Sequence, residues 1–258
     1  MPEFSREIRL GLSHLERALA LAVERSVQSP RKEWVLFSGG VDSAVIAKLA
    51  AKARPDIRLL TVGTIDCEDL KHAGKAAGAL MLPLDFTEVS EKNVRVLEQK
   101  AGIFCKSRLD LELAIPLVAA CEFARGGLLV SGSGAEELFL GYAYHGKAFQ
   151  EKQDLEALRR NELEGLEEKD LARNRAVAQS FGVELALPFL DPLVVRAALS
   201  LPAILNFSSG ENKRLLRTMA RTLAVPEASA GRPKRAFQYG SGVHALLKRL
   251  EKQEKRPA

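Results

Sequence analysis

Apolar residues follow two distinct patterns along the chain. Over residues 3–27 they recur every three or four positions, which predicts an amphipathic helix that ends at Ser29-Pro30. Elsewhere they form short uninterrupted runs, which are typical of buried strands. We predict these strands at residues 33–37, 57–62, 81–86 and 127–130. Helical patterns mark the segments between them, at residues 44–53, 68–80, 90–101 and 111–125.

This alternation of strands and helices indicates the fold class. It predicts an α/β fold with a doubly wound parallel sheet that helices cover on both faces. From Tyr142 onward the pattern changes to helical runs interrupted by prolines. We therefore expect an N-terminal helix over residues 1–32, an α/β core over residues 33–145 and a mainly helical part over residues 146–258.

Composition and charge add limits to this picture. A chain of 258 residues with 47% hydrophobic and 28% charged residues is globular, which excludes disorder and collagen-like repetition. The net charge of +5 favours an anionic partner, and a nucleotide satisfies it as well as RNA does. Residues 151–169 are expected to form a solvated helix face, and residues 248–256 a frayed basic tail. Scattered cysteines, the lack of a secretory signal and the lack of a membrane-spanning run favour a cytoplasmic protein.

The most informative segment links the first predicted strand to the following helix. It reads Ser38-Gly39-Gly40-Val41-Asp42-Ser43. Two glycines at a strand end let backbone N–H groups approach an anion, and the helix N-terminus adds its positive dipole end. The hydroxyls of Ser38 and Ser43 can donate to phosphate, and Asp42 can bind Mg²⁺. A capped tight turn is the alternative, but all six positions together favour a phosphate-binding loop.

This loop resembles that of the ATP pyrophosphatase superfamily, whose members cleave ATP to AMP and pyrophosphate. Further segments resemble blocks of the asparagine synthase domain, which β-lactam and carbapenam synthetases share. These segments are Ser131 to Tyr142 (SGSGAEELFLGY), Gly182 to Asp191 (GVELALPFLD), Lys213 to Arg217 (KRLLR) and Arg232 to Phe237 (RPKRAF). Their order and spacing agree over residues 34–242. The resemblance implies a Rossmann-like core of the adenine nucleotide alpha-hydrolase type.

The resemblance also implies a site for ATP and Mg²⁺. The residues implied to bind ATP are Ser38, Gly39, Gly40, Val41, Asp42, Ser43, Val62, Gly63, Ser131, Gly132 and Lys213. Asp42 and Glu136 are the implied magnesium ligands, and with Lys234 they form the implied catalytic set. In that role Lys234 stabilises negative charge on the phosphate oxygens as it develops. Of the four histidines, His145 is the one that lies near these blocks as a catalytic candidate.

Departures from the family pattern are found in the part of the pocket that would handle the amine. Ser133 stands where the family has a glutamate thought to take the proton from ammonia, and a hydroxyl cannot do so at neutral pH. Ala186 replaces an arginine, and residues 173–175 read Arg-Asn-Arg in place of Arg-Asp-Asp. The family's glutaminase domain needs a cysteine directly after the initiator methionine, but this chain has Pro2. We expect an intact ATP site beside an altered acceptor pocket.

The leading hypothesis is an AMP-forming ligase that adenylates a small-molecule carboxylate, aspartate or a related one. Free ammonia, or ammonia from a separate glutaminase subunit, would then amidate the acyl-AMP. One alternative is an RNA-modifying adenylating enzyme, but no zinc module or aromatic-interleaved basic strip supports a nucleic-acid partner. Another is a catalytically impaired, ATP-binding regulatory subunit, because of Ser133 and Ala186. No membrane partner is expected, and a homodimer is one option for the assembly.

Overall fold

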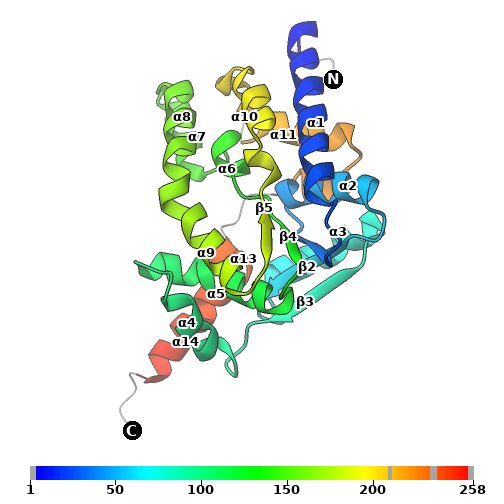
Figure 1. Cartoon of the computed structure of the whole chain (residues 1–258). Helices are drawn as coiled ribbons and strands as arrows, with labels where there is room; N and C mark the ends of the chain where they lie inside the picture. The colour runs from blue at the N-terminus through cyan, green and yellow to red at the C-terminus, as the bar shows by residue number, and fades with distance from the viewer. Residues whose placement is uncertain (1–3, 209–210, 233–236, 255–258) are drawn as a thin grey trace.

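A five-stranded parallel sheet forms the centre of the protein in a computed structural model that describes residues 4–208, 211–232 and 237–254. The strands follow the order β3-β2-β1-β4-β5, and every neighbouring pair is parallel. Their bounds are β1 Glu33–Leu36, β2 Arg58–Gly63, β3 Leu84–Glu88, β4 Leu128–Val130 and β5 Glu184–Ala186. The predicted doubly wound parallel sheet is therefore confirmed (Figure 1).

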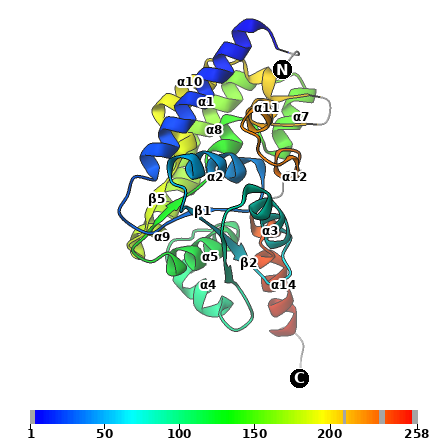
Figure 2. The same ribbon diagram turned by 90° about the vertical axis from the view of Figure 1, so that its right-hand side faces the viewer.

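Alternating side chains of the strands point into two separate hydrophobic cores. Val35, Leu59 and Val130 share one row of the sheet and belong to the first core, whereas Trp34 and Leu129 belong to the second. Figure 2 shows α1 and α2 on one side of the strands, and α4 and α5 on the other. Helices on the first face are α1 Arg6–Ser26, α2 Val41–Ala53, α3 Glu68–Leu80, α10 Pro192–Leu199 and α11 Arg214–Thr222. Helices on the second are α4 Val94–Gly102, α5 Arg108–Phe123, α9 Ala172–Ser180 and α14 Val243–Glu254.

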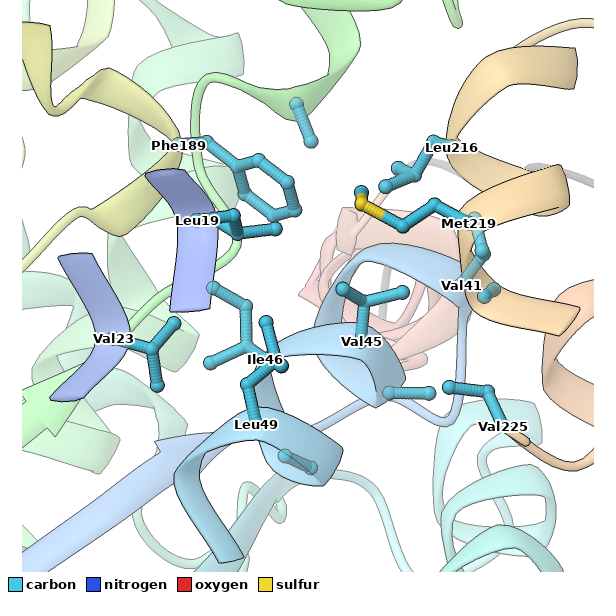
Figure 3. Close-up of a cluster of buried hydrophobic side chains, with 14 of the residues drawn as sticks. Leu19, Val23, Val41, Val45, Ile46, Leu49, Phe189, Leu216, Met219 and Val225 are labelled. Atoms are coloured by element: carbon cyan, nitrogen blue, oxygen red, sulfur yellow. The ribbon is translucent and has the colours of Figure 1, made fainter. Parts of the chain in front are cut away.

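The first core holds α2 between α1 and α11, as Figure 3 shows. Leu19 and Val23 reach it from α1, and Leu216 and Met219 reach it from α11. Ile46 on α2 is fully buried among them. Burying an aliphatic side chain of this size contributes roughly 1.5–3 kcal/mol. Because α2 begins directly after the phosphate loop, this packing fixes the position of the loop.

The C-terminal half adds a long, interrupted helical column to the side of the sheet (Figure 1). It consists of α8 Leu155–Leu166, a π-helical turn over Glu167–Leu171 and then α9. A π-helical turn inside a helix is often found at a functional site. The remaining helices are α6 Ala135–Leu138, α7 Ala143–Gln150, α12 Glu227–Ala230 and α13 Phe237–Gly240. Short 3₁₀ turns lie at Pro188–Leu190 and Ala203–Asn206.

Three details of the predicted elements need correction. The sequence patterns did not predict β5, which pairs with β4 and brings the C-terminal half into the sheet. The predicted frayed tail is wrong as far as Glu254, because α14 reaches that residue and Arg249 pairs with Glu91 at 2.7 Å. Residues 255 and 256 lie outside the described part of the chain. The charged segment is exposed on one side only, since Arg159 is 1% exposed and donates to the carbonyls of Ala198 and Leu201.

No helix within the described residues is both long enough and apolar enough to cross a membrane. The predicted division of the chain into parts at residues 32 and 145 stays a prediction.

Candidate active site

The phosphate loop lies at the carboxyl end of β1, where the strand order reverses. The chain runs outward from β1 to β2 and β3, and then returns to β4 on the other side of β1. In open parallel sheets, ligands bind in the crevice at this switch point, because the two neighbouring loops diverge there. The segment Ser131–Gly134 follows β4 and faces the phosphate loop across the crevice, with an ideal Cβ at Gly132 only 3.2 Å from the Asp42 Cβ.

Glycines in the phosphate loop are required by its geometry. Gly39 has a φ of +74°, and a Cβ there would lie 2.8 Å from the backbone carbonyl carbon of His72 on α3. Only glycine combines this conformation with so close an approach. Gly40 is the N-cap of α2, so the first N–H groups of that helix point into the crevice. The local structure therefore agrees with the predicted anion-binding loop.

A cavity of about 530 Å³ opens in front of the loop. Its volume lies within the usual range for sites of small molecules and cofactors. Predicted ATP-binding residues on its wall are Ser38, Gly40, Asp42, Ser43, Val62, Ser131 and Gly132. A smaller cavity of about 60 Å³ also touches the loop and adds Val41 and Lys213, while Glu136 lines both cavities. Gly39 and Gly63 line neither cavity; at Gly63 a Cβ would lie 2.5 Å from the Ser241 carbonyl oxygen.

Lys213 lies between the two carboxylates predicted to bind magnesium. Its Nζ donates to Asp42 Oδ1 at 2.8 Å and Oδ2 at 2.7 Å, and it is 2.7 Å from Glu136 Oε1. The lysine is only 2% exposed. Burial alone would lower its pKa, but the negative charges of Asp42 and Glu136 outweigh burial and raise it. Lys213 is therefore a buried, charged ammonium group at neutral pH.

The donor set of this cluster suits a hard divalent cation. Asp42 and Glu136 come from α2 and α6, and their carboxylate oxygens converge on one positive charge. Magnesium prefers one or two carboxylates together with phosphate and water oxygens. Within the described residues, no group of three or more histidine, cysteine, aspartate or glutamate side chains could hold a metal ion. The chemistry of the two carboxylates therefore fits Mg²⁺ held jointly with phosphate oxygens.

Gly141 makes room for this lysine and was missed as a site residue. A Cβ at this position would lie 1.9 Å from Lys213 Cε and 2.0 Å from Glu136 Oε2. Lys213 itself has a φ of +58°, a strained conformation for a residue with a side chain. Strain of this kind persists only where the surroundings enforce it, and it gathers at functional sites. Gly141 belongs to the block Ser131 to Tyr142, and its place in that block is the sequence feature that could have identified it as a site residue.

Two arginines, also missed as site residues, fasten the last block to the phosphate loop. Arg232 donates to the Ser38 carbonyl oxygen, and its Nη2 is 2.7 Å from Asp69 Oδ1 on α3. Arg217 on α11 donates to the carbonyls of Ala230 and Arg232. Both arginines belong to the quoted sequence blocks, and this is the sequence feature that could have identified them as site residues. Lys234, the predicted catalytic lysine, lies outside the described residues, two positions after Arg232.

The opposite end of the cavity is walled by side chains from α6 to α9. Tyr142 donates to Glu137 Oε1 at 2.6 Å, and Tyr144 donates to Glu162 Oε1 at 2.8 Å. Glu137 is 4% exposed, and burial raises its pKa. Burial likewise raises the pKa of the Tyr144 hydroxyl, with further contributions from Glu162 and then Glu137.

Arg173, beside these residues on the cavity wall, is held by two acids. Its Nη1 lies 2.8 Å from Asp110 Oδ1, and its Nη2 lies 2.6 Å from Asp170 Oδ1. Asp170 and Asn174 line the same part of the wall. Asp170 was not singled out from the sequence, because it directly follows the charged segment 151–169 and looks like one more of its charges.

Two residues that depart from the family pattern, Ser133 and Ala186, lie in or beside the segment that follows β4. Ser133 lines the cavity, and its hydroxyl is 2.9 Å from that of Ser131. Ala186 ends β5, and its carbonyl accepts from the backbone N–H of Ser131. His145 is fully buried behind the wall, where its Nδ1 accepts from the backbone N–H of Tyr142 at 3.1 Å. Burial lowers the His145 pKa, so the ring is neutral at pH 7.

Comparison with known proteins supports the family resemblance that the quoted sequence blocks carry. A sequence profile of the asparagine synthase family matches residues 14–180 and 148–256. A candidate asparagine synthetase (glutamine-hydrolyzing) of Methanocaldococcus jannaschii is 32% identical over 278 residues, which cover 93% of this chain and 51% of that protein. The asparagine synthetase (glutamine-hydrolyzing) of Homo sapiens is 29% identical over 253 residues, covering 91% of this chain and 44% of that protein. The chain spans about half the length of these curated relatives.

Among solved structures, an NH3-dependent NAD synthetase from Campylobacter jejuni is similar with a TM-score of 0.44 and 16% identity. The similarity covers 96% of this chain and 88% of that one. Because the family profile matches well over half of its residues, the chain belongs to the asparagine synthase family.

Proposed function

We propose that the chain is an ATP-dependent ligase that converts a small-molecule carboxylate to an acyl-AMP and then to an amide. The observation that carries this proposal is the convergence of Asp42, Glu136 and Lys213 beside the phosphate loop. Family membership supports ATP as the substrate. Aspartate or a related amino acid is the proposed carboxylate, and ammonia is the proposed nitrogen donor.

In the first step, a carboxylate oxygen of the substrate attacks the α-phosphorus of ATP, and pyrophosphate leaves. Backbone N–H groups at the start of α2 and the hydroxyls of Ser38 and Ser43 hold the leaving phosphates. Asp42 and Glu136 would hold Mg²⁺, which neutralises charge on the pyrophosphate when it is bound. Lys213 then directs its Nζ at phosphate oxygens rather than at the two carboxylates, and we propose that Lys234 acts on the same charge.

In the second step, the nitrogen attacks the acyl carbon, AMP leaves, and one proton is lost from the nitrogen. The side chains near the acyl group come from the wall formed by α6 to α9. Ammonia is proposed to arrive from solution or from a separate glutaminase subunit, so the chain alone should release no glutamate from glutamine.

The test is pyrophosphate exchange into ATP, measured with radiolabelled pyrophosphate across a panel of the twenty amino acids. Exchange requires Mg²⁺ and one of these carboxylates, and the nucleotide product is AMP. Asp42→Asn should abolish exchange and leave the circular dichroism spectrum unchanged. Asp56→Asn is the matched control, since the Asp56 side chain is 78% exposed at the far end of the strands. Production of ADP and phosphate without AMP would contradict the proposal.

A further inference from the structure

The acceptor end of the cavity has a wall whose charges indicate what kind of substrate it accepts. Glu137 on α6 and Asp170 in the π-helical turn both line this end. Among the side chains that the structure describes, Arg173 is the one basic group on the cavity wall. A substrate with a second carboxylate needs a positive charge at this end, so the state of Arg173 matters.

Arg173 is already engaged by the protein. Its Nη1 donates to Asp110 at 2.8 Å, and its Nη2 donates to Asp170 at 2.6 Å. Its Nε and Nη2 also donate to the Asn174 side-chain oxygen, at 3.2 and 3.1 Å. Every nitrogen of the guanidinium group therefore has a protein acceptor, and two carboxylates balance its single charge. An incoming carboxylate would have to displace one of these acceptors.

Glu137 is a buried carboxylate at the same end of the cavity. It is 4% exposed, and its Oε1 accepts from the Tyr142 hydroxyl at 2.6 Å. Burial raises its pKa more than the Tyr142 hydroxyl and the Lys213 ammonium lower it. No basic side chain in the described part of the chain forms an ion pair with it. A buried carboxylate of this kind is costly, and a positively charged ligand group beside it would offset that cost.

Two tyrosines give the wall beside Glu137 the same preference. Burial, and then the negative charge of Glu137, raise the pKa of Tyr142, so its hydroxyl stays a neutral donor. The rings of Tyr142 and Tyr144 stack with their centroids 5.4 Å apart, and both residues line the cavity. The faces of aromatic rings carry negative potential, which attracts cations. A carboxylate beside tyrosine rings is thus a suitable surface for an ammonium or guanidinium group.

Apolar side chains complete this part of the wall. Leu166 ends α8 and Leu171 ends the π-helical turn, and both line the cavity. Hydrocarbon stems of cationic groups commonly lie along apolar surface of this kind. Glu137 directly follows Glu136 on α6, so it lies one residue along the chain from the carboxylates of the phosphate end. The wall therefore suits a small molecule with a carboxylate, a short carbon stem and a positive charge.

We infer that the acceptor end binds a carboxylate substrate through a positively charged nitrogen on that substrate, and that Glu137 is the residue that recognises it. The substrate's carboxylate faces the phosphate end, and its ammonium or guanidinium group donates to Glu137. A second carboxylate at that position would meet Glu137, and this repulsion selects against dicarboxylates. The inference rests on the proposed function and narrows its substrate from aspartate to related amino carboxylates that lack a second acid.

The test uses matched compounds that differ only in charge. Butyrate, 4-aminobutyrate and glutarate share a three-carbon stem that ends in hydrogen, ammonium or carboxylate, and triads with shorter and longer stems extend the set. Binding to the wild type is measured by calorimetry with Mg²⁺ and an ATP analogue that has a methylene group between its α- and β-phosphorus. In the best triad, the ammonium compound should bind roughly 10–100-fold more tightly than the uncharged one, the usual effect of a hydrogen bond to a charged group. The dicarboxylate should bind more weakly than both.

Glu137→Gln tests the residue itself. Its amide oxygen can still accept from Tyr142, so the substitution changes the charge and little of the shape. The preference for the ammonium compound should disappear, while binding of the uncharged compound should stay within about twofold of the wild type. Glu137→Asp, which keeps the charge, should retain part of the preference. Glu164→Gln, at an exposed glutamate on α8, is the control and should keep all of it.

Other results overturn the inference. A wild type that binds the dicarboxylate as tightly as the ammonium compound, or that binds all three alike, contradicts it. Equal losses for all three compounds in Glu137→Gln would show a structural role for this residue. Pyrophosphate exchange with the same compounds separates the inference from the proposed function. Fastest exchange with a dicarboxylate would keep the ligase and refute the charge preference, whereas the expected order of binding without any exchange would support the role of Glu137 and contradict the ligase.

Discussion

The two ends of the cavity are formed by different kinds of groups, mainly backbone at one end and side chains at the other. The phosphate end consists of a backbone loop, a helix N-terminus and a buried ammonium group between two carboxylates. Packing on α1 and α11 fixes it, and close contacts at Gly39 and Gly141 leave no room for side chains. The acceptor end is a wall of side chains from α6 to α9, with a π-helical turn and a half-exposed tyrosine. In the proposed ligase, the chemistry of ATP would thus be assigned to a backbone loop held by packing, and recognition of the carboxylate to side chains of the wall.

The largest effect should come from Lys213→Met at the phosphate end. The substitution removes the ammonium group that Asp42 and Glu136 share, and breaking such a pair costs about 3–5 kcal/mol of the free energy of unfolding. Pyrophosphate exchange should be lost as well. Chemical denaturation should also show that added Mg²⁺ stabilises Lys213→Met more than the wild type, because the metal replaces the missing charge.

Lys52→Met, an exposed lysine on the same helix as Asp42, is the control for this experiment. A Lys213→Met variant as stable as the wild type without Mg²⁺ would mean that the ammonium does not hold the two carboxylates together.

The second-largest effect on stability and exchange should come from Gly141→Ala. Its Cβ would overlap Lys213 Cε, and overpacking of this kind typically costs about 1–3 kcal/mol. Exchange should fall with stability, since the displaced groups are those proposed to act on phosphate. Gly78→Ala is the matched control, because nothing lies within 4 Å of a Cβ there and the site is in the helix α3. That control should be neutral or stabilising by about 0.5–1 kcal/mol.

Arg173→Met should act on the acceptor end alone. It removes the guanidinium from Asp110 and from Asp170, and Asp170 lines the wall on this side. We expect the KM for the carboxylate to rise by roughly 10–100-fold, a loss of about 1.5–3 kcal/mol that is typical of hydrogen bonds to charged groups. The KM for ATP should stay within about twofold. A matching rise in both constants would remove the distinction between the two ends.

The smallest effect, and the finest comparison, concerns Ser133. Ser133→Glu should raise amide formation a few-fold, because it returns a carboxylate beside Ser131. Exchange should not change. Ser133→Gln is the control, and an equal gain there would show that proton acceptance is not the reason.

Sequence patterns located the loop Ser38 to Ser43 and the helix that follows it, but they did not single out most of the cavity wall, for physical reasons. A loop that binds phosphate through its backbone needs glycines and small hydroxyl residues in a fixed order, so Ser38 to Ser43 are recognisable alone. The cluster of Asp42, Glu136 and Lys213 joins residues far apart in the chain, and only the resemblance implied that they meet. Glu162 was hidden, because one inward carboxylate looks the same as its neighbours in a segment rich in charge. Strand β5 was missed because three residues are too few to show a period.

The central claim is that the phosphate end works without the acceptor end, and one measurement tests it most directly. Exchange of radiolabelled pyrophosphate into ATP is followed in the wild type with Mg²⁺ and the panel of amino acids, in buffer free of ammonia and of any amine besides the amino acid tested. The account predicts carboxylate-dependent exchange without ammonia, and no exchange in Asp42→Asn. Exchange that appears only when ammonia is added would contradict it, because the two ends would then act as one.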